Sequence, residues 1–206
     1  MTGWDRPYYR PTFELGVPYS LALNKAQEID HGIVGGFGGS YEDSALLAQA
    51  AAHNGDHLEL GTLYGATAIM VALTKMTLGY NGKVYCVDNF SYRPEGPEPS
   101  ADLVMENAKK FGVENYIVLL EGDTYPLPPD IINRHYESAY IDAAHDFDSC
   151  VTDWYGVKLL ADRVVFHDYD FHPSHMGVVQ VVELAIKEPD WRLVHLSHHS
   201  AILQKV

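Results

Sequence analysis

Short apolar runs alternate along the chain with longer segments in which apolar residues recur at helical spacing. Strands are predicted at 57–61, 83–88, 116–121, 138–142 and 163–167, and helices at 66–78, 101–111, 147–160 and 177–187. The strands are nearly continuous in apolar residues, as in a parallel sheet covered on both faces. The alternation therefore predicts an α/β domain of the Rossmann-like, three-layer sandwich type, with a mostly parallel sheet between helices.

The C-terminal pattern departs from this alternation. The apolar runs at 191–197 and 201–205 are separated by only a few residues, too few for a helical crossover. We expect these runs to form an antiparallel hairpin, which brings the predicted sheet to seven strands.

The N-terminal residues 1–39 have a different composition from the rest. They are rich in proline, aromatic residues and glycine, and they end in His31-Gly-Ile-Val-Gly-Gly-Phe-Gly-Gly39, which has no stable periodicity. We interpret them as an arm and a mobile loop, either a lid or an ordered arm packed on the core or on a second subunit. Ser40 resembles the start of a capping box and predicts a helix as far as Asn54. One domain is expected over 40–206.

Composition limits the kind of partner. With 206 residues and 47% hydrophobic content, the chain can bury one well-packed core. Its formal net charge of −14 would repel a phosphate backbone, so nucleic acid is not an expected substrate. A solvated acidic surface is the commoner reason for such a charge, but carboxylates gathered in a cleft would suit a divalent cation or a cationic ligand.

No signal for a membrane or an oxidising compartment is found. No run reaches the roughly 18 to 20 apolar residues of a membrane span. The N-terminus, with Asp5 and Arg6, lacks an apolar signal-peptide core. Cys86 and Cys150 lie in segments predicted to be buried, which argues against a disulfide scaffold. A cytoplasmic location is the default expectation, and a homo-oligomer is left open.

Acidic residues follow three predicted strands. These are Glu59 with the turn Gly61-Thr-Leu-Tyr-Gly65, Asp88, and Asp123. In an open α/β sheet the ligand lies outside the carboxyl ends of the strands, so all three would border one crevice. A carboxylate at Asp88 can accept hydrogen bonds from both hydroxyls of a ribose, and Asp123 could meet an adenine amino group.

The glycine spacing bears on the choice between two nucleoside cofactors. Gly-x-x-x-Gly lacks the middle glycine of Gly-x-Gly-x-x-Gly, which lets a backbone approach a pyrophosphate. A glutamate two residues before the turn would also repel phosphates, but it suits a ligand with ammonium and sulfonium charges. S-adenosylmethionine (SAM) therefore fits better than NAD.

Five motifs, in order, resemble those of small class I methyltransferases over about residues 40–206. They are His57-Leu-Glu-Leu-Gly-Thr-Leu-Tyr-Gly-Ala-Thr-Ala, Val84-Tyr-Cys-Val-Asp88, Glu121-Gly-Asp-Thr, Tyr140-Ile-Asp-Ala-Ala-His145 and Val164-Val-Phe-His-Asp-Tyr-Asp170. The sequence looks most similar to a bacterial group with a His-Asp-Tyr strand end, distantly similar to catechol and macrolide-sugar O-methyltransferases. The resemblance implies a seven-stranded sheet with a terminal antiparallel hairpin. The expected cofactor-binding residues are Glu59, Gly61, Thr62, Tyr64, Gly65, Asp88, Asn89, Gly122 and Asp123.

Candidates for the chemistry of transfer follow the next two strands. Five residues could converge beside the methyl group of the cofactor: Asp142, His145, His167, Asp168 and Asp170. An oxygen acceptor must lose its proton, and histidine, with an unperturbed pKa near 6.5, is suited to taking it. We therefore expect His145 or His167 to be the general base.

Resemblance to metal-dependent O-methyltransferases implies another role for these positions. In those enzymes an aspartate at the position of Asp142 and an acidic or amide pair at the next strand end hold Mg²⁺. This sequence places His167 and Asp168 at that pair, and a histidine ligand would favour a transition metal over magnesium. Metal-free chemistry and a cation held by Asp142, His167 and Asp168 both remain open.

The expected function is O-methylation of a small hydroxylated molecule, a sugar or a secondary metabolite, with SAM as methyl donor. Alternatives are methylation of nitrogen or carbon, and a SAM-binding domain without transfer activity. More remote alternatives are an NAD-dependent oxidoreductase and a non-catalytic oligomeric module, since a fold does not fix a function.

Overall fold

A computed structural model describes residues 19–35, 41–197 and 199–206. The elements, in chain order, are α1 (Tyr19–Gly32), α2 (Tyr41–Ala50), β1 (His57–Leu60), α3 (Ala66–Leu78), β2 (Val84–Asp88), α4 (Ala101–Lys110), η1 (Glu114–Tyr116), β3 (Ile117–Glu121), α5 (Pro129–Ile132), β4 (Ser138–Ile141), α6 (Phe147–Val157), β5 (Arg163–His167), η2 (Pro173–His175), α7 (Met176–Ala185), β6 (Trp191–Leu196) and β7 (Ser200–Lys205).

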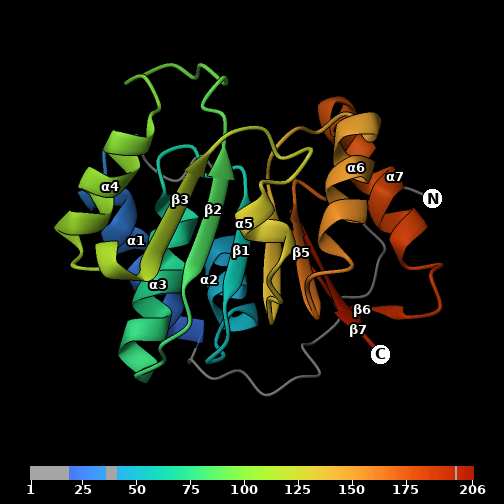
Figure 1. The fold of residues 1–206 in the computed structure, drawn as a ribbon, viewed down its shortest axis with the longest axis horizontal. Helices are drawn as coiled ribbons and strands as arrows, with labels where there is room; N and C mark the ends of the chain where they lie inside the picture. The colour runs from blue at the N-terminus through green and yellow to red at the C-terminus, as the bar shows by residue number, and fades with distance from the viewer. Residues whose placement is uncertain (1–18, 36–40, 198) are drawn as a thin grey trace.

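The strands form one seven-stranded sheet in the order β3-β2-β1-β4-β5-β7-β6 (Figure 1). The first five strands are parallel, and β7 is antiparallel to both β5 and β6. The predicted fold class and the antiparallel hairpin are therefore confirmed. Strand order reverses direction after β1, which leaves a crevice at the carboxyl ends of β1 and β4.

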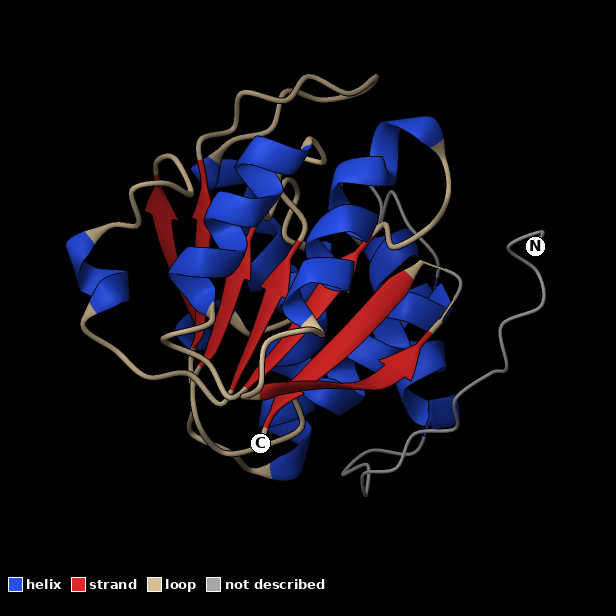
Figure 2. Ribbon diagram, turned by 90° about the vertical axis from the view of Figure 1, so that its right-hand side faces the viewer, coloured by secondary structure: helices blue, strands red, loops and turns tan. Residues whose placement is uncertain are grey.

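Helices cover both faces of the sheet (Figure 2). Successive side chains of a strand point to opposite faces, so each strand contributes to two cores. Val84 and Cys86 of β2 pack in the core under α1 to α4, whereas Tyr85 and Val87 pack in the core under α5, α6 and α7. Cys86 and Cys150 are free and buried, as predicted.

The N-terminal segment differs from the interpretation as an arm and a mobile loop. Residues 19–32 form helix α1, whose Ala22, Ala26 and Ile29 are almost completely buried against the core. The spacing of these residues is helical, but the surrounding prolines and glycines masked it in the sequence. The alternative of an ordered arm packed on the core describes this part. Residues 1–18, the glycine-rich 36–39 and Ser40 lie outside the described residues.

Helix α2 ends four residues before the predicted Asn54. The buried Lys75 of α3 donates from Nζ to the carbonyl oxygens of His53 (3.0 Å) and Gly55 (2.7 Å) and lies 3.5 Å from that of Ala51. His53 and Gly55 lie in the loop that follows α2, so the lysine holds this loop against α3. No helix among the described residues is long and apolar enough to cross a membrane.

Candidate functional site

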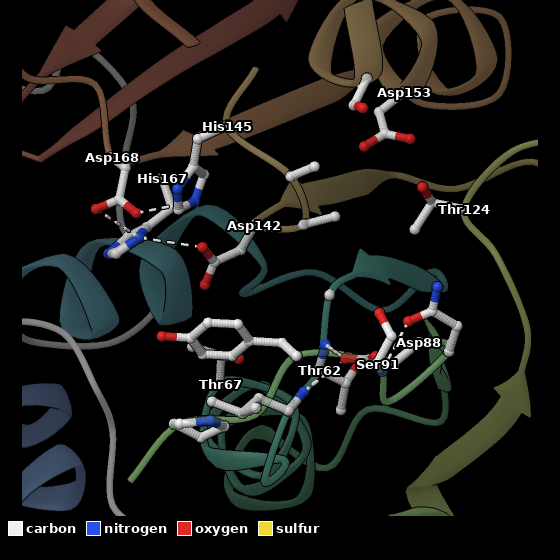
Figure 3. Close-up of a pocket in the computed structure, with 18 of the residues that line it drawn as sticks. Thr62, Thr67, Asp88, Ser91, Thr124, Asp142, His145, Asp153, His167 and Asp168 are labelled. Atoms are coloured by element: carbon white, nitrogen blue, oxygen red, sulfur yellow. Dashed lines mark hydrogen bonds and ion pairs between the residues drawn. The ribbon is translucent and has the colours of Figure 1, made fainter. Parts of the chain in front are cut away.

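A cavity of about 1270 Å³ opens at the carboxyl edge of the sheet, between the loops that follow β1 to β5 and the first turns of α6 (Figure 3). Most of the residues predicted for the site line it. These are Gly61, Thr62, Tyr64, Asp88, Asn89, Asp123, Asp142, His145, His167 and Asp168. Glu59, Gly65 and Gly122 are not among the lining residues.

Asp88 fixes the turn that follows β1. Its Oδ2 accepts hydrogen bonds from the backbone N–H groups of Thr62 (2.7 Å) and Leu63 (2.8 Å), and its Oδ1 accepts one from Phe90 (2.6 Å). A carboxylate oxygen has two lone pairs, so Asp88 can still accept hydrogen bonds from a ribose. The residue thus shapes the cofactor-facing turn as well as bordering the cavity.

The glycines of this turn are required by packing. A Cβ on Gly61, whose φ is +85°, would lie 2.1 Å from the carbonyl oxygen of Asp142. Gly65 (φ +84°) begins α3, and a Cβ there would meet Val104 at 2.8 Å. The backbone after β4 therefore lies directly against Gly61. The β1 turn packs closely on the loop that carries Asp142.

Glu59 lies beneath the turn, completely buried on the α3 side of the sheet. Neither carboxylate oxygen makes a hydrogen bond of ordinary geometry with a described residue. Burial raises the pKa of Glu59 to about 8, against the opposing effect of the Thr67 and Thr62 hydroxyls. Glu59 therefore lies below the turn and outside the lining of the cavity.

Asp123 and Tyr64 have partners of their own. Asp123 is exposed and its Oδ1 accepts a hydrogen bond from Asn89 Nδ2 (2.7 Å). The Tyr64 hydroxyl donates to the Pro97 carbonyl (2.7 Å), which ties the β1 turn to the loop after β2. Both residues still line the cavity.

Histidines and aspartates meet where β4 and β5 end. His167 Nδ1 lies 3.2 Å from Asp142 Oδ1 and 3.2 Å from Asp168 Oδ1, and His145 Nε2 lies 3.1 Å from Asp168 Oδ2 (Figure 3). The Tyr140 hydroxyl donates to Asp142 Oδ2 (3.2 Å). The structure thus brings together Asp142, His145, His167 and Asp168. Asp170, expected in the same group, does not line the cavity and lies beside His175 and His199 instead.

The charges of this cluster are coupled. Burial lowers the pKa of His167, but the carboxylates of Asp142 and Asp168 outweigh burial and hold it well above its ordinary value. The hydrogen bond to Asp168 raises the pKa of His145 against the opposing effect of burial. Burial also acts to raise the pKa of Asp168, yet the two histidines hold it far below its usual range. Asp168 is thus an anion at neutral pH.

The cluster has the donor atoms of a metal site. Atoms of Asp142, His167 and Asp168 all lie within 4.8 Å of one another, as do atoms of His145, Asp168 and His175. His167 Nδ1 is buried and makes no hydrogen bond of ordinary geometry with a described residue, despite the two carboxylates beside it. A nitrogen so placed fits a cation shared with the carboxylates, and a mixed nitrogen and oxygen set suits a transition metal.

The backbone is strained at three loops around the cavity. Leu63 (φ +50°), Phe90 (φ +50°) and Asp168 (φ +53°) adopt a left-handed conformation that is uncommon outside glycine. They follow β1, β2 and β5 respectively. Such conformations persist only where the surrounding structure holds them, and they gather at functional sites.

Carboxylates outnumber the basic groups of the lining. Carboxylates line the cavity from several loops and from α6: Asp88, Glu95, Asp123, Asp142, Asp148, Asp153 and Asp168. No lysine or arginine is found among its described lining residues. Such a cavity would repel a pyrophosphate and attract a ligand that carries a sulfonium and an ammonium group. The volume and the charge both fit SAM.

Several lining residues were not predicted from the sequence. His175 is one of them; it is only partly exposed and its Nδ1 lies 2.9 Å from Asp170 Oδ1. Ser149, Thr152 and Asp153 of α6 also line the cavity. Their spacing of three and four residues places them on one face of the helix. The polar character of that face could have indicated from the sequence that it borders the cavity.

Comparisons with known proteins place the chain in a family and identify structures with a similar fold. The methyltransferase domain family matches residues 58–169. No match was found among curated proteins. Among solved structures, the O-methyltransferase NovP has a TM-score of 0.72 at 14% identity, covering 92% of this chain and 100% of NovP.

Two further structures are similar. The O-methyltransferase TomG from Streptomyces achromogenes, in complex with SAM, has a TM-score of 0.65 at 15% identity over 95% of this chain and 92% of TomG. The O-methyltransferase from Bacillus cereus, in complex with SAH, has a TM-score of 0.63 at 17% identity over 92% of each chain. At these identities the likeness concerns the fold. Together with the family match and the acidic cavity, it shows that the chain belongs to the methyltransferase domain family and is a class I SAM-dependent methyltransferase.

Proposed function

We propose that this enzyme methylates a hydroxyl oxygen of a free small molecule, such as a sugar or a secondary metabolite. The observation that carries the proposal is the cluster of His145, His167, Asp142 and Asp168 at one end of the cofactor cavity. A hydroxyl is a poor nucleophile until its proton is removed, and this cluster can remove one. The resemblance to the His-Asp-Tyr group and the O-methyltransferases among the structural neighbours support the same acceptor atom.

His145 is the proposed general base. Its Nε2 is held by Asp168, so Nδ1 is the nitrogen that takes the proton from the acceptor. Asp168 stays ionised and stabilises the imidazolium that forms. His167 is less suited to this role, because its Nδ1 faces two carboxylates and its pKa is held well above the ordinary value.

Asp142, His167 and Asp168 are the proposed ligands of a divalent cation. When bound, the cation would lower the pKa of the acceptor hydroxyl and hold it in place. Asp142 also accepts a hydrogen bond from the buried Tyr140, which orients the carboxylate. The remaining step for the protein is to align the acceptor oxygen with the methyl group of SAM.

The test of the cation is binding of Mn²⁺ to the chelated protein, followed by electron paramagnetic resonance. Wild type should bind Mn²⁺, and Asp142→Asn and His167→Ala should each weaken binding by about 10- to 100-fold. His135→Ala, at an exposed histidine near the amino ends of the parallel strands, is the matched control and should bind as wild type does. Equal binding by all four proteins would rule out the site.

The test of the base is turnover with a panel of hydroxylated acceptors and labelled SAM. His145→Ala should lower kcat by about 10²- to 10⁴-fold while SAM affinity stays within about threefold. Because the pKa of His145 is raised, wild-type kcat should rise with pH through a range above the ordinary histidine value. Analysis of the product identifies the acceptor atom, and a methylated amine or carbon would contradict O-methylation.

A further inference from the structure

One buried carboxylate of the cavity has no part in the proposed chemistry. Asp153 belongs to α6 and lies beside Thr124, which follows β3, and both line the cavity. Figure 3 shows both residues well separated from His145, His167 and Asp168. The carboxylate therefore serves the end of the cavity that is remote from methyl transfer.

Asp153 is placed to receive a hydrogen bond from a ligand. The residue is 2% exposed, and its Oδ2 is buried without a hydrogen-bond partner among the described residues. A buried acceptor that lacks a partner costs free energy, so such groups need an explanation. Burial raises the pKa of Asp153 to about 6, while the Thr124 hydroxyl favours the ionised form. At neutral pH the Asp153 carboxylate is therefore mainly ionised, and its Oδ2 can accept a hydrogen bond from a ligand.

The position of Asp88 indicates which part of SAM lies near Asp153. The reactive methyl must lie beside His145, and the ribose is expected at Asp88, at the end of β2. The base then extends beyond β2 toward the loop after β3, where Thr124 faces Asp153. The exocyclic amino group of adenine offers two N–H donors, which match a carboxylate acceptor.

Asp123 is the other carboxylate of this region, and the sequence favoured it for adenine. It is exposed, and Asn89 already donates to its Oδ1 at 2.7 Å. A hydrogen bond shielded from water discriminates more strongly than an exposed one. Asp153 is therefore the better placed of the two.

We propose that Asp153 reads the adenine base of the cofactor by accepting a hydrogen bond from its exocyclic amino group. The inference rests on SAM as the cofactor and, through the proposed function, on the methyl group lying beside His145, but not on the identity of the acceptor or the cation.

The test compares S-adenosylhomocysteine with S-inosylhomocysteine, in which a carbonyl replaces the amino group, by calorimetry on the full chain. Wild type should bind the adenine compound about 10- to 100-fold more tightly. In Asp153→Asn, whose amide can donate to the carbonyl, this preference should fall below about threefold or reverse. Asp190→Asn, at an exposed residue far from the cavity, is the control and should keep the wild-type preference.

Three outcomes would overturn the inference. Equal binding of both compounds by wild type, or a preference that survives in Asp153→Asn but is lost in Asp123→Asn, would each do so while leaving the cofactor assignment intact. Failure of wild type to bind S-adenosylhomocysteine would remove the inference together with that assignment. If Asp153→Asn does not fold, a crystal structure of the wild-type complex decides, since the amino nitrogen must lie within about 3.2 Å of an Asp153 oxygen.

Discussion

Single residues at the β1 turn show what a sequence motif reveals and what it leaves out. The positions of Gly61, Glu59 and Asp88 could be predicted, because parallel strands bring their carboxyl ends to one edge. Their contacts could not. That Asp88 accepts hydrogen bonds from Thr62 and Leu63 depends on backbone directions that the sequence does not encode locally. Asp153 was missed because its role depends on which loop lies beside its helix face, and the sequence does not show that the loop after β3 lies there.

The first prediction separates close packing from backbone conformation at glycine. Gly61 and Gly79 both have positive φ, but a Cβ would clash only at Gly61. Gly79→Ala should lower the free energy of unfolding by about 1 kcal/mol, the cost of a left-handed conformation. Gly61→Ala should cost at least about 2 kcal/mol more, because the turn must move from the Asp142 carbonyl. Chemical denaturation measures both, and equal losses would contradict the packing argument.

The second prediction concerns Glu59 and pH. Its pKa is raised to about 8 in the folded protein, so the folded state holds a proton that the unfolded state has lost above its ordinary pKa. The stability contribution is therefore complete below about pH 4.5 and disappears as pH rises through about 8. Relative to Glu59→Gln, wild type should lose a few kcal/mol over this window, on the order of 1.4 kcal/mol for each pH unit between the two pKa values.

Denaturation of ligand-free protein at a series of pH values between 4.5 and 8 checks this expectation. A constant difference between wild type and Glu59→Gln would mean that the buried carboxyl ionises as readily in the folded state as in water.

At the scale of elements, the strands and the longer helices after residue 41 were predicted to within a few residues, apart from the end of α2, whereas the short η1, α5 and η2 were not predicted. Their patterns are local, and the near-continuous apolar strands are decisive. Helix α1 was not predicted, because its buried stripe lies between prolines and glycines that signal irregular structure. The end of α2 was also missed; the loop that follows it is held by Lys75, which lies more than 20 residues later in the chain.

The third prediction tests whether α1 belongs to the core. Ile29 is fully buried, whereas Leu21 on the same helix is 41% exposed. Ile29→Ala should lower the free energy of unfolding by about 2 to 4 kcal/mol, and Leu21→Ala by less than about 1 kcal/mol. Similar small losses in both variants would mean that α1 is only loosely attached.

The fourth prediction tests Lys75 as the partner of the loop that follows α2. Lys75→Met keeps most of the apolar stem but leaves the carbonyls of His53 and Gly55 without their donor. We expect a loss of about 2 kcal/mol, since an unpaired acceptor costs about 1 to 3 kcal/mol. Lys83 donates to a single exposed carbonyl, that of Asn115, and Lys83→Met should cost less than about 0.5 kcal/mol. Thermal unfolding of the two variants makes the comparison.

On the scale of the whole molecule, the net charge of −14 takes on a specific meaning. From the sequence alone it indicated only a solvated surface or an acidic cleft. In the structure, carboxylates surround the cavity, and no described lining residue is a lysine or arginine. The sequence thus gives the net charge of the protein but not the position of the carboxylates, because their position depends on which loops lie side by side.

The fifth prediction follows from this field. SAM carries a sulfonium charge that S-adenosylhomocysteine lacks, so the ratio of their affinities reports attraction by the cavity. This ratio should fall several-fold as NaCl is raised from about 20 to about 500 mM, because salt screens charges beyond a short distance. Adenosine, which is neutral, serves as the control and should bind equally at both concentrations. A ratio independent of salt would show that the carboxylates are neutralised or turned away.

The left-handed residues around the cavity create a conflict between thermal stability and activity. Glycine at Leu63 or Asp168 would relieve about 1 to 2 kcal/mol of backbone cost. A library selected only for survival at high temperature would therefore gather glycine or asparagine at these positions, and at Asp168 it would discard a carboxylate of the reaction site. Directed evolution of this enzyme for industrial durability would need a second round of sorting, by methyl transfer, to keep its variants working.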